Sequence, residues 1–435
     1  MPDNKIPAAM ITAPGSGQGK SMVTAALARL HRNAGRNVRV FKHGPDYLDP
    51  MVLEVASGNP VYQLHPWMTG EEECRWRLAE AAQSADLILV EGSMGLFDGS
   101  PSSGDLAKLA GIPALPVIDA KGMAQTFGAV ALGLARFDPE LPVHQVIANK
   151  IGSPYHGELL RESLPDGISL LGAIPRNDAM NIPDRHLGLV LAAEMDDLSD
   201  RLDKAAEVLT SAGLDVLPKP VSFHFEAPSR PELLLAGLRI VVARDAAFSF
   251  IYRANLDLLT AMGAELVYFS PLTDSEVPMA DALWLPGGYP ELHASILAEN
   301  LAMLASIRAF HQAGKPILAE CGGLMACAEE LADKDGKVHS LLGLVPGRAT
   351  MANRLTALGL QSLETQLGGL RGHTYHHSSL ETPWQPAARA KKQAGSEGEA
   401  VYRDQKLVAS YFHGYFPSAP ALISAIFRGE EIRFS

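Results

Sequence analysis

The fold of this chain is decided near its beginning, by the nine residues Ala13-Pro14-Gly15-Ser16-Gly17-Gln18-Gly19-Lys20-Ser21. An apolar run at 8–12 precedes them and a helix-like stretch at 22–33 follows. Glycines between a strand and a helix let backbone N–H groups wrap a phosphate, while Lys20 can reach a nucleotide's β- and γ-phosphates and the Ser21 hydroxyl can bind Mg²⁺. The usual pattern has glycine where this chain has Pro14. The strand–loop–helix context still favours a nucleotide site over a glycine-rich turn with a chance Lys-Ser pair.

More buried runs alternate with helical stretches through the first half of the chain. Runs at 38–41, 87–90, 114–118, 143–148 and 170–174 are rich in Val, Ile and Leu, and a stretch such as 124–135 is helix-like. They lack the strict alternation of half-exposed strands, as expected of parallel strands that are covered on both faces. The pattern predicts an α/β fold with a doubly wound parallel sheet.

A second α/β pattern follows a change in composition. Residues 198–237 pass from a polar helix to two proline-rich stretches, at 217–220 and 227–231, which are typical of a linker. Strands are expected after it at 238–243, 266–269, 282–285, 316–319 and 407–412, and an exposed loop at 387–399. We therefore expect a phosphate-loop domain at 1–197, a linker region at 198–237 and a second domain at 238–435.

Composition agrees with two domains and excludes several functions. The chain has 435 residues, which is too long for one ordinary core, so two domains are expected. With 47% hydrophobic residues, both domains can have a substantial core. Its formal net charge is −12, without a Lys/Arg run, so nucleic acid and acidic membranes are not expected partners. We find no signal peptide and no apolar stretch long enough to span a bilayer. Three cysteines without metal spacing favour a reduced, cytoplasmic protein.

Polar residues follow three of the expected strands. Glu91 ends the strand that includes 87–90, at the edge where parallel sheets bind ligands and close to the phosphate loop. It is a candidate Mg²⁺ ligand or a strand-end charge in solvent. Residues 42–50 include Asp46 and fit a site for substrate and metal, or a plain loop. Asn149 ends another strand and can pair with an adenine edge or serve as a simple cap.

A candidate nucleophile lies in the second half. Cys321 follows the strand at 316–319 and precedes Gly322-Gly323, which allow a sharp turn into a helix. The positive end of that helix should favour the thiolate, and His413, after the strand at 407–412, can deprotonate the thiol. The alternative is a buried structural thiol. Cys74 and Cys327 lack such surroundings, and we assign both to structure.

Backbone N–H groups are needed to stabilise the oxyanion that such a thiol would form. Gly287 and Gly288 follow the strand at 282–285, and glycine lets a backbone approach closely; the N–H of Gly322 is a further candidate. His373, His376 and His377 resemble a metal cluster. No Cys or carboxylate at ligand spacing completes it, so a structural or interdomain role is preferred over zinc.

Several longer segments together resemble the cobyrinic (or hydrogenobyrinic) acid a,c-diamide synthase family, over essentially the whole chain. They lie at 13–21, 44–50, 91–99, 182–189, 243–248, 286–291 and 319–324. The resemblance implies an N-terminal domain similar to dethiobiotin synthetase and a C-terminal class I glutamine amidotransferase domain of flavodoxin-like fold. It implies amidation of the a- and c-side-chain carboxylates of a corrin ring with glutamine, ATP and Mg²⁺, through an acyl phosphate, in cobalamin biosynthesis.

The resemblance also extends the list of site residues. Asp46, Tyr47 and Leu48 become candidate substrate residues, and Asp46 a second metal ligand. Because corrin carboxylates would meet an acidic protein, local cations are needed, and Arg185 and His186 are candidates, with Arg176 weaker. Many class I amidotransferases carry Glu two residues after the histidine; here that position is Tyr415, so what orients His413 is open.

Two alternatives remain at this stage. One is a cobyric acid synthase-like enzyme that amidates other corrin carboxylates. The other is a regulatory or partitioning ATPase built on a related phosphate loop, which would need neither Cys321 nor His413. The expected partners are a corrin polycarboxylate, glutamine and ATP; a homodimer is left open.

Overall fold

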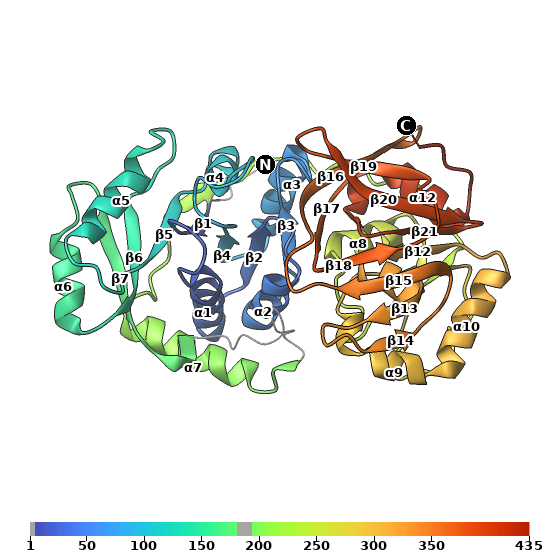
Figure 1. The fold of residues 1–435 in the computed structure, drawn as a ribbon. Coiled ribbons are helices and arrows are strands. Elements are labelled where there is room, and N and C mark those ends of the chain that lie inside the picture. Colours follow the sequence, from blue (N-terminus) through green and yellow to red (C-terminus); the bar gives the residue numbers. More distant parts are fainter. Residues whose placement is uncertain (1–4, 181–193, 435) are drawn as a thin grey trace. The chain divides into compact units, whose positions relative to one another are not determined.

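The computed structural model describes residues 5–180 and 194–434, and the chain divides into two compact units, Met1–Pro228 and Ser229–Ser435 (Figure 1). We call them unit 1 and unit 2. The division falls inside the expected linker region. The first part of that region was misassigned, however, because it forms α7 (Leu198–Ser211), which packs on α1 (Lys20–Asn33) in unit 1. Leu202 and Leu209 of α7 are fully buried there, so its apolar face belongs to the unit 1 core.

Unit 1 is built on a parallel sheet in the order β3-β2-β4-β1-β5-β6-β7. Its strands are β1 (Lys5–Thr12), β2 (Val38–His43), β3 (Tyr62–Leu64), β4 (Leu87–Glu91), β5 (Ala114–Asp119), β6 (Gln145–Ile151) and β7 (Ser169–Pro175). A further strand, β8 (Pro220–Ser222), pairs antiparallel with the start of β1. The doubly wound sheet expected for this half is confirmed, and β3 and β8 are short additions without a sequence signal.

Helices cover both faces of this sheet (Figure 1). They are α1, α2 (Leu48–Ser57), α3 (Glu71–Ala81), α4 (Ser103–Ala110), α5 (Thr126–Arg136), α6 (Pro154–Glu162) and α7, with a 3₁₀ turn, η1, at Asp178–Met180. Alternate residues of β1 point to opposite faces: Ala9 and Ile11 join the core beneath α1, α2 and α7, whereas Ala8 and Met10 join the core beneath α3 and α4. Burial on both faces explains why these strands read as continuous apolar runs.

Unit 2 contains a larger mixed sheet in the order β10-β9-β11-β12-β21-β20-β19-β16-β17-β22. The first five of these are parallel neighbours, β9 (Arg239–Ala243), β10 (Glu265–Phe269), β11 (Ala282–Leu285), β12 (Ile317–Glu320) and β21 (Leu407–Ser410). The others pair antiparallel: β16 (Ala357–Thr365), β17 (Gly368–His376), β19 (Ala388–Lys392), β20 (Glu397–Asp404) and β22 (His413–Gly414).

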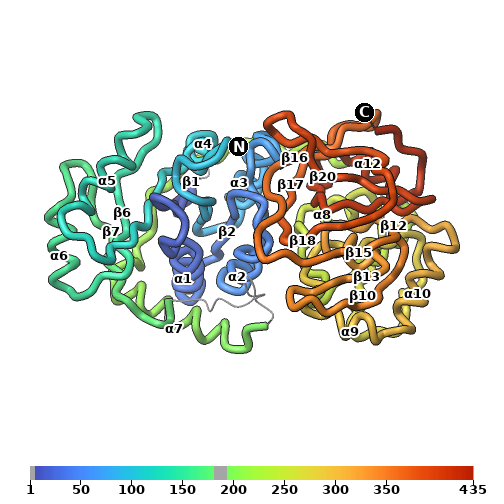
Figure 2. Tube along the Cα trace, in the orientation of Figure 1, coloured from blue at the N-terminus to red at the C-terminus, as the bar shows by residue number. Residues whose placement is uncertain are grey.

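A smaller sheet, several helices and two 3₁₀ turns complete the described part of unit 2, whose path the tube in Figure 2 also traces. The sheet has the order β14-β13-β15-β18, with β13 (Ala328–Ala332), β14 (Val338–Ser340), β15 (Val345–Met351) and β18 (Ser378–Glu381). The helices are α8 (Arg253–Ala261), α9 (Ala294–Glu299), α10 (Leu301–Gln312), α11 (Gly322–Cys327) and α12 (Pro420–Arg428), with 3₁₀ turns η4 (Pro290–Leu292) and η5 (Phe416–Ser418). None of the described helices is both long and apolar enough to cross a membrane.

The exposed loop expected at 387–399 is wrong, because most of it is the β19–β20 hairpin. Ala390 alone in β19 is fully buried, and its neighbours Arg389 and Lys391 are exposed. A strand with one small inward residue and charged outward residues carries too weak an apolar signal to be told from a loop.

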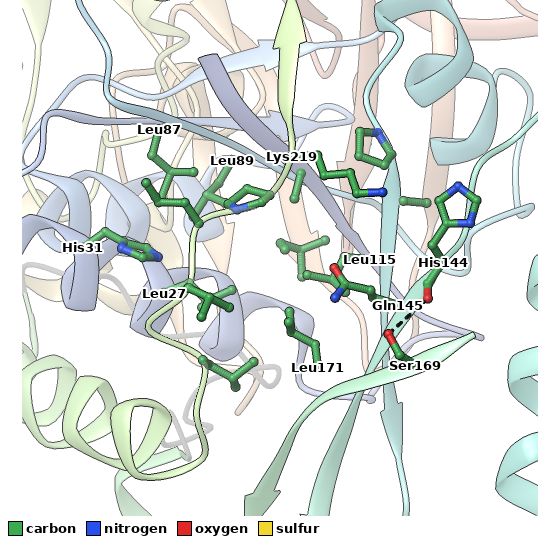
Figure 3. Close-up of a pocket in the computed structure, with 18 of the residues that line it drawn as sticks. Leu27, His31, Leu87, Leu89, Leu115, His144, Gln145, Ser169, Leu171 and Lys219 are labelled. Carbon is green, nitrogen blue, oxygen red and sulfur yellow. Dashed lines mark hydrogen bonds between the residues drawn. The ribbon is translucent and has the colours of Figure 1, made fainter. Parts of the chain in front are cut away.

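A cavity of about 610 Å³ opens in unit 1 away from the phosphate loop (Figure 3). Leu87, Leu115 and Leu171, from the first residues of three strands, line it together with His144 and Lys219. It therefore lies toward the amino ends of the strands, and none of its lining residues is a predicted site residue.

Candidate active sites

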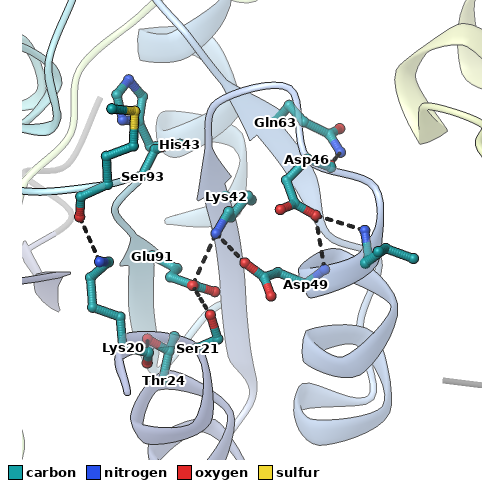
Figure 4. A network of polar contacts seen from close by, with 12 residues as sticks. Lys20, Ser21, Thr24, Lys42, His43, Asp46, Asp49, Gln63, Glu91 and Ser93 are labelled. Atoms are coloured by element: carbon teal, nitrogen blue, oxygen red, sulfur yellow. Dashed lines mark hydrogen bonds and ion pairs between the residues drawn. The ribbon is translucent and has the colours of Figure 1, made fainter. Parts of the chain in front are cut away.

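The phosphate loop joins the end of β1 to α1, at the centre of the unit 1 sheet. Lys20 is buried and folds back across the loop, so that its Nζ donates to the carbonyl oxygens of Gly15 (3.1 Å) and Met94 (2.5 Å) (Figure 4). Burial and the nearby Lys42 lower the pKa of Lys20. Because these two hydrogen bonds go to neutral carbonyls, the ammonium can exchange them for anionic phosphate oxygens at little cost.

Ser21 and Glu91 lie together, although 70 positions separate them in the sequence. The Ser21 hydroxyl donates to Glu91 Oε1 at 2.6 Å, and Glu91 ends β4 with no exposed surface. Burial, followed by the nearby Asp49, raises the pKa of Glu91 to about 7. Any cation that enters here therefore relieves a strongly disfavoured buried charge.

Lys42 and Asp49 complete this cluster; both lie in the segment 42–50 expected to bind substrate and metal, although neither was singled out there. Lys42 pairs with Glu91 across β2 and β4; its Nζ donates to Glu91 Oε1 at 2.9 Å and also to Asp49. Although burial opposes it, Asp49 and Glu91 raise the pKa of Lys42, which stays charged. The signal that was available is a lysine close to the end of an otherwise buried strand, where a charge needs a partner.

Asp46 has a different position from the one expected of a metal ligand. Its Oδ1 accepts from the backbone N–H groups of Leu48 (2.7 Å) and Asp49 (3.0 Å), at the start of α2. Tyr47 is the residue that immediately precedes this helix and is half-buried. The structure thus places Asp49, rather than Asp46, beside Glu91, and the metal and substrate roles of Asp46, Tyr47 and Leu48 stay predictions.

The cluster fits Mg²⁺, which prefers oxygen ligands and keeps several waters or phosphate oxygens. Glu91 Oε2 is buried and accepts no hydrogen bond from a residue that the structure describes. With the Ser21 hydroxyl and the carboxylate of Asp49 it offers the hard oxygen donors that such an ion takes.

Asn149, near the end of β6, holds the phosphate loop in place. Its Nδ2 donates to the Gln18 carbonyl oxygen at 2.9 Å, and its Oδ1 accepts from the Lys150 N–H at 3.0 Å. The Gln18 side chain in turn accepts from the Asp119 N–H at 2.8 Å. An adenine contact by Asn149 therefore stays a prediction, beside the loop-positioning role that the structure gives it.

The cations expected to meet the corrin carboxylates are only partly described. Arg185 and His186 lie outside the described residues. Arg176 follows β7 and is exposed, with its backbone N–H bound to the Ile151 carbonyl oxygen at 3.3 Å.

In unit 2 Cys321 occupies a strained turn between β12 and α11. Its φ of 48° and ψ of −104° lie outside the regions that side-chain-bearing residues ordinarily adopt. Its backbone N–H donates to the Ser410 carbonyl oxygen of β21 at 2.7 Å. A β-carbon on Gly323 would stand 2.0 Å from the Leu285 carbonyl oxygen, so only glycine lets the helix pass this close to β11.

His413 and Cys321 converge beside Gly287. A β-carbon built on Gly287 would lie 2.3 Å from His413 Cε1 and 3.4 Å from Cys321 Cβ. The glycine leaves the space between imidazole and thiol open, as a nucleophile and its base require. Gly288 N lies 3.0 Å from the position of a β-carbon on Gly322, so all three predicted oxyanion glycines gather at this turn.

The electrostatics of this site differ from the expectation that the helix end favours a thiolate. Burial, followed by Glu291, raises the pKa of Cys321, and the hydrogen bond with the Gly322 backbone opposes this only in part. Burial, with the neighbouring His373 and His376, lowers the pKa of His413 well below its usual value. Desolvation outweighs the short helix α11, and the resting pair is a neutral thiol and a neutral imidazole.

Glu320 fixes the backbone around the pair. Its two oxygens accept from the Gly414 N–H at 2.7 Å and from Trp284 Nε1 at 2.8 Å, and burial raises its pKa to about 7. Sequence reasoning missed it, although a carboxylate directly before the nucleophile in a buried strand was a usable signal.

The three histidines at 373, 376 and 377 make different contacts. His376 Nδ1 bonds the Ser378 carbonyl oxygen at 2.8 Å and its Nε2 lies 3.2 Å from Glu399, whereas His373 stacks on His413. His377 instead contacts Tyr375 edge-on. Cys74 and Cys327 are buried free thiols in the cores.

Comparison with known proteins agrees with this division. Residues 9–190 match the CobQ/CobB/MinD/ParA nucleotide binding domain, and residues 239–421 match the CobB/CobQ-like glutamine amidotransferase domain. The chain is 57% identical to hydrogenobyrinate a,c-diamide synthase of Stutzerimonas stutzeri A1501, covering 98% of this chain and 100% of the relative. It is 55% identical to the enzyme of the same name from Pseudomonas aeruginosa PAO1, covering 98% of each. It is 46% identical to cobyrinate a,c-diamide synthase of Herminiimonas arsenicoxydans, covering 99% of this chain and 98% of the relative.

Proposed function

Because this chain belongs to the family of hydrogenobyrinate and cobyrinate a,c-diamide synthases, we propose that it amidates the a- and c-side-chain carboxylates of a corrin ring, with nitrogen from glutamine and energy from ATP. The observation that carries the proposal is the coexistence of a charged phosphate-loop cluster around Lys20 and Glu91 in unit 1 with the Cys321–His413 pair in unit 2. A regulatory ATPase would not need the second site.

Unit 1 would activate the carboxylate. A carboxylate resists attack by ammonia because its carbon is electron-rich and oxide is a poor leaving group. Transfer of the γ-phosphoryl group to a carboxylate oxygen breaks the bond to ADP and forms an acyl phosphate, from which phosphate leaves when ammonia attacks. Lys20 would stabilise the negative charge of the phosphoryl group during transfer, and Lys42 would hold Glu91 and Asp49 in position.

Ser21, Glu91 and Asp49 would hold Mg²⁺, which supplies positive charge against the phosphate oxygens when bound. The loop backbone from Gly15 to Gly19 would cradle the phosphates.

Unit 2 would release ammonia. Cys321 Sγ attacks the glutamine carboxamide carbon while His413 takes the thiol proton, and the oxyanion is stabilised by backbone N–H groups of Gly288 and Gly322. His413 then protonates the leaving ammonia, which leaves a thioester. Water attacks the thioester, which releases glutamate and regenerates the free thiol of Cys321.

We propose the cobalt-free acid as the preferred corrin substrate, since relatives at 57% and 55% identity are named for hydrogenobyrinate. Turnover on hydrogenobyrinic and cobyrinic acid, measured side by side with glutamine, MgATP and product mass analysis, tests this. Two mass losses of one unit each, with the a,c-diamide as product, are expected. Amidation at other positions would favour the cobyric acid synthase alternative, and ATP hydrolysis without any amidation would contradict the proposal.

The surroundings follow from the same chemistry. We propose a cytoplasmic enzyme, since ATP and glutamine are supplied there, without nucleic acid or membrane partners, in keeping with the net charge of −12. The oligomeric state, for which the sequence left a homodimer open, is to be measured by light scattering.

A further inference from the structure

We infer that His373 is the positioning residue of His413, and that Tyr252 holds His373 in the orientation this requires. The inference rests on the proposed glutaminase role of unit 2. It answers how the imidazole is aligned in a chain that carries Tyr415 where related amidotransferases carry a carboxylate.

Tyr415 contributes to this arrangement through its packing. It is almost fully buried, its backbone N–H donates to the Arg371 carbonyl oxygen at 2.7 Å, and its ring contacts Tyr252 edge-on, with centroids 5.7 Å apart. The residue at the position of the missing carboxylate thus supports Tyr252.

His373 reaches His413 from the neighbouring strand. The two residues are direct partners in the antiparallel pair of β17 and β22, which puts both side chains on one face of the sheet. Their rings stack, with centroids 4.9 Å apart and planes inclined by 15°. A ring lying parallel to the imidazole restricts its rotation about the Cβ–Cγ bond, the motion that would take its nitrogen away from the thiol.

Tyr252 fixes His373 in turn. Its hydroxyl lies 2.9 Å from His373 Nδ1, within a hydrogen bond, and Tyr252 itself has no exposed surface. A ring nitrogen that is bound in this way determines which tautomer the histidine adopts and how its plane is turned. The fixed ring is then a rigid wall for its neighbour.

Burial also bears on this arrangement. Both histidines are buried, at 4% and 2% exposure, so His413 is neutral until it takes the thiol proton. The stacked ring thus takes over the orienting function of a carboxylate without placing a carboxylate in a closed site.

The test compares His373→Ala, His373→Phe and Tyr252→Phe in the full chain. Glutamine hydrolysis and ammonia-dependent amidation are measured separately, together with thermal unfolding. His339→Gln is the matched control, because His339 is a buried histidine paired with Asp333 in the smaller sheet.

His373→Ala should lower kcat for glutamine hydrolysis by about a hundredfold with little change in KM, because a misoriented base impairs the chemical step and not glutamine binding. His373→Phe, which keeps a flat ring, should recover about tenfold of that loss. Tyr252→Phe should lose about tenfold while keeping its packing, and so remains informative if the His373 variants fail to fold. Ammonia-dependent amidation should be retained throughout.

Wild-type kcat in His373→Ala or in Tyr252→Phe would overturn the inference, as would a rise in KM alone or a Phe variant no better than Ala. Absence of glutamine hydrolysis in the wild-type enzyme would instead contradict the proposed function, so the two failures are distinguishable.

Discussion

The two candidate sites use the same position in a sheet for opposite electrostatic purposes. Both lie at the carboxyl ends of parallel strands, after β1 and β4 in unit 1 and after β11 and β12 in unit 2. The first site gathers charges in advance: hydrogen bonds join Lys42 to Asp49 and Glu91, and the charge of Lys20 lies close enough to interact with all three. The second keeps its nucleophile and base neutral by burial.

The difference follows from when charge is present in each reaction. A nucleotide triphosphate and a carboxylate are anionic before anything happens, so their site must hold compensating charge from the start. A glutamine carboxamide is neutral and charge appears only as the thiol attacks, so that site needs oriented dipoles and a base more than fixed charge. Substitutions that separate the two sites test this contrast.

The largest effect is expected from Cys321→Ser. Serine keeps the shape of the turn, but its hydroxyl is a far weaker acid and the neutral His413 cannot activate it, so glutamine-dependent amidation should fall about 10⁴-fold or more. Ammonia-dependent amidation, assayed at high ammonium concentration, should be largely intact. Loss of both activities in a folded variant would break the separation of the sites.

Lys20→Ala should impair the phosphate-loop site of unit 1. Removal of one charge-assisted contact to a phosphoryl group in transfer should lower amidation with either nitrogen donor by about a hundredfold to a thousandfold. Lys204→Ala, an exposed lysine on α7, is the control. Normal ATP-dependent amidation by Lys20→Ala would sink the assignment of the phosphate loop.

Glu91→Gln sharpens the metal part of the unit 1 site. The amide keeps the shape and can still accept from Ser21, but the negative charge is gone, so the Mg²⁺ concentration for half-maximal rate should rise by about 10- to 100-fold and turnover should fall. Glu80→Gln, in which a surface partner of Arg39 is changed, should behave as wild type. An unchanged Mg²⁺ requirement in Glu91→Gln would rule out the ligand role.

The smallest effect, on stability and not on chemistry, is expected from Glu320→Gln. Burial raises the pKa of Glu320 from 4.5 to about 7 in the folded chain, so between these values the folded state binds more protons than the unfolded state and stability falls as pH rises. The loss reaches about 3 kcal/mol above pH 7. Glutamine does not titrate, so its constant cost, from leaving Gly414 N–H or Trp284 Nε1 without an acceptor, is independent of pH.

Thermal unfolding at pH 5 and pH 8 measures this difference. The melting temperature of the wild type should drop relative to that of the variant between the two values, by roughly 2–4 °C per kcal/mol for a domain of this size. A parallel shift of both proteins would show that Glu320 does not titrate in this range.

The sequence was sufficient to predict the buried strands and the residues that lie at their carboxyl ends. The proximity of Ser21 to Glu91 could be anticipated, because the phosphate loop and the end of an adjacent parallel strand must meet at one edge. Lys42 and Asp49 could not, since their pairing depends on the register of β2 with β4 and on the turn into α2.

Burial was the physical quantity that sequence reasoning handled least well. The thiolate expected at Cys321 rested on a helix end, and only the packing around α11 reveals that desolvation is the larger influence. The same holds for α7, a polar helix that the sequence analysis included in the linker region. In the structure its Leu202 and Leu209 are buried in the unit 1 core. The orientation of His413 needed the β17–β22 pairing, a contact between strands about 40 positions apart with no local signature.

The covered position of Cys321 has a consequence for how readily oxidants reach the sulfur. Peroxides and alkylating agents react with thiolates, and they reach exposed ones fastest. Cys321 is 4% exposed and its pKa is raised, so the resting nucleophile presents little thiolate to either kind of reagent. The burial that makes the sulfur depend on His413 for its reactivity also protects it from sulfenic acid formation between turnovers.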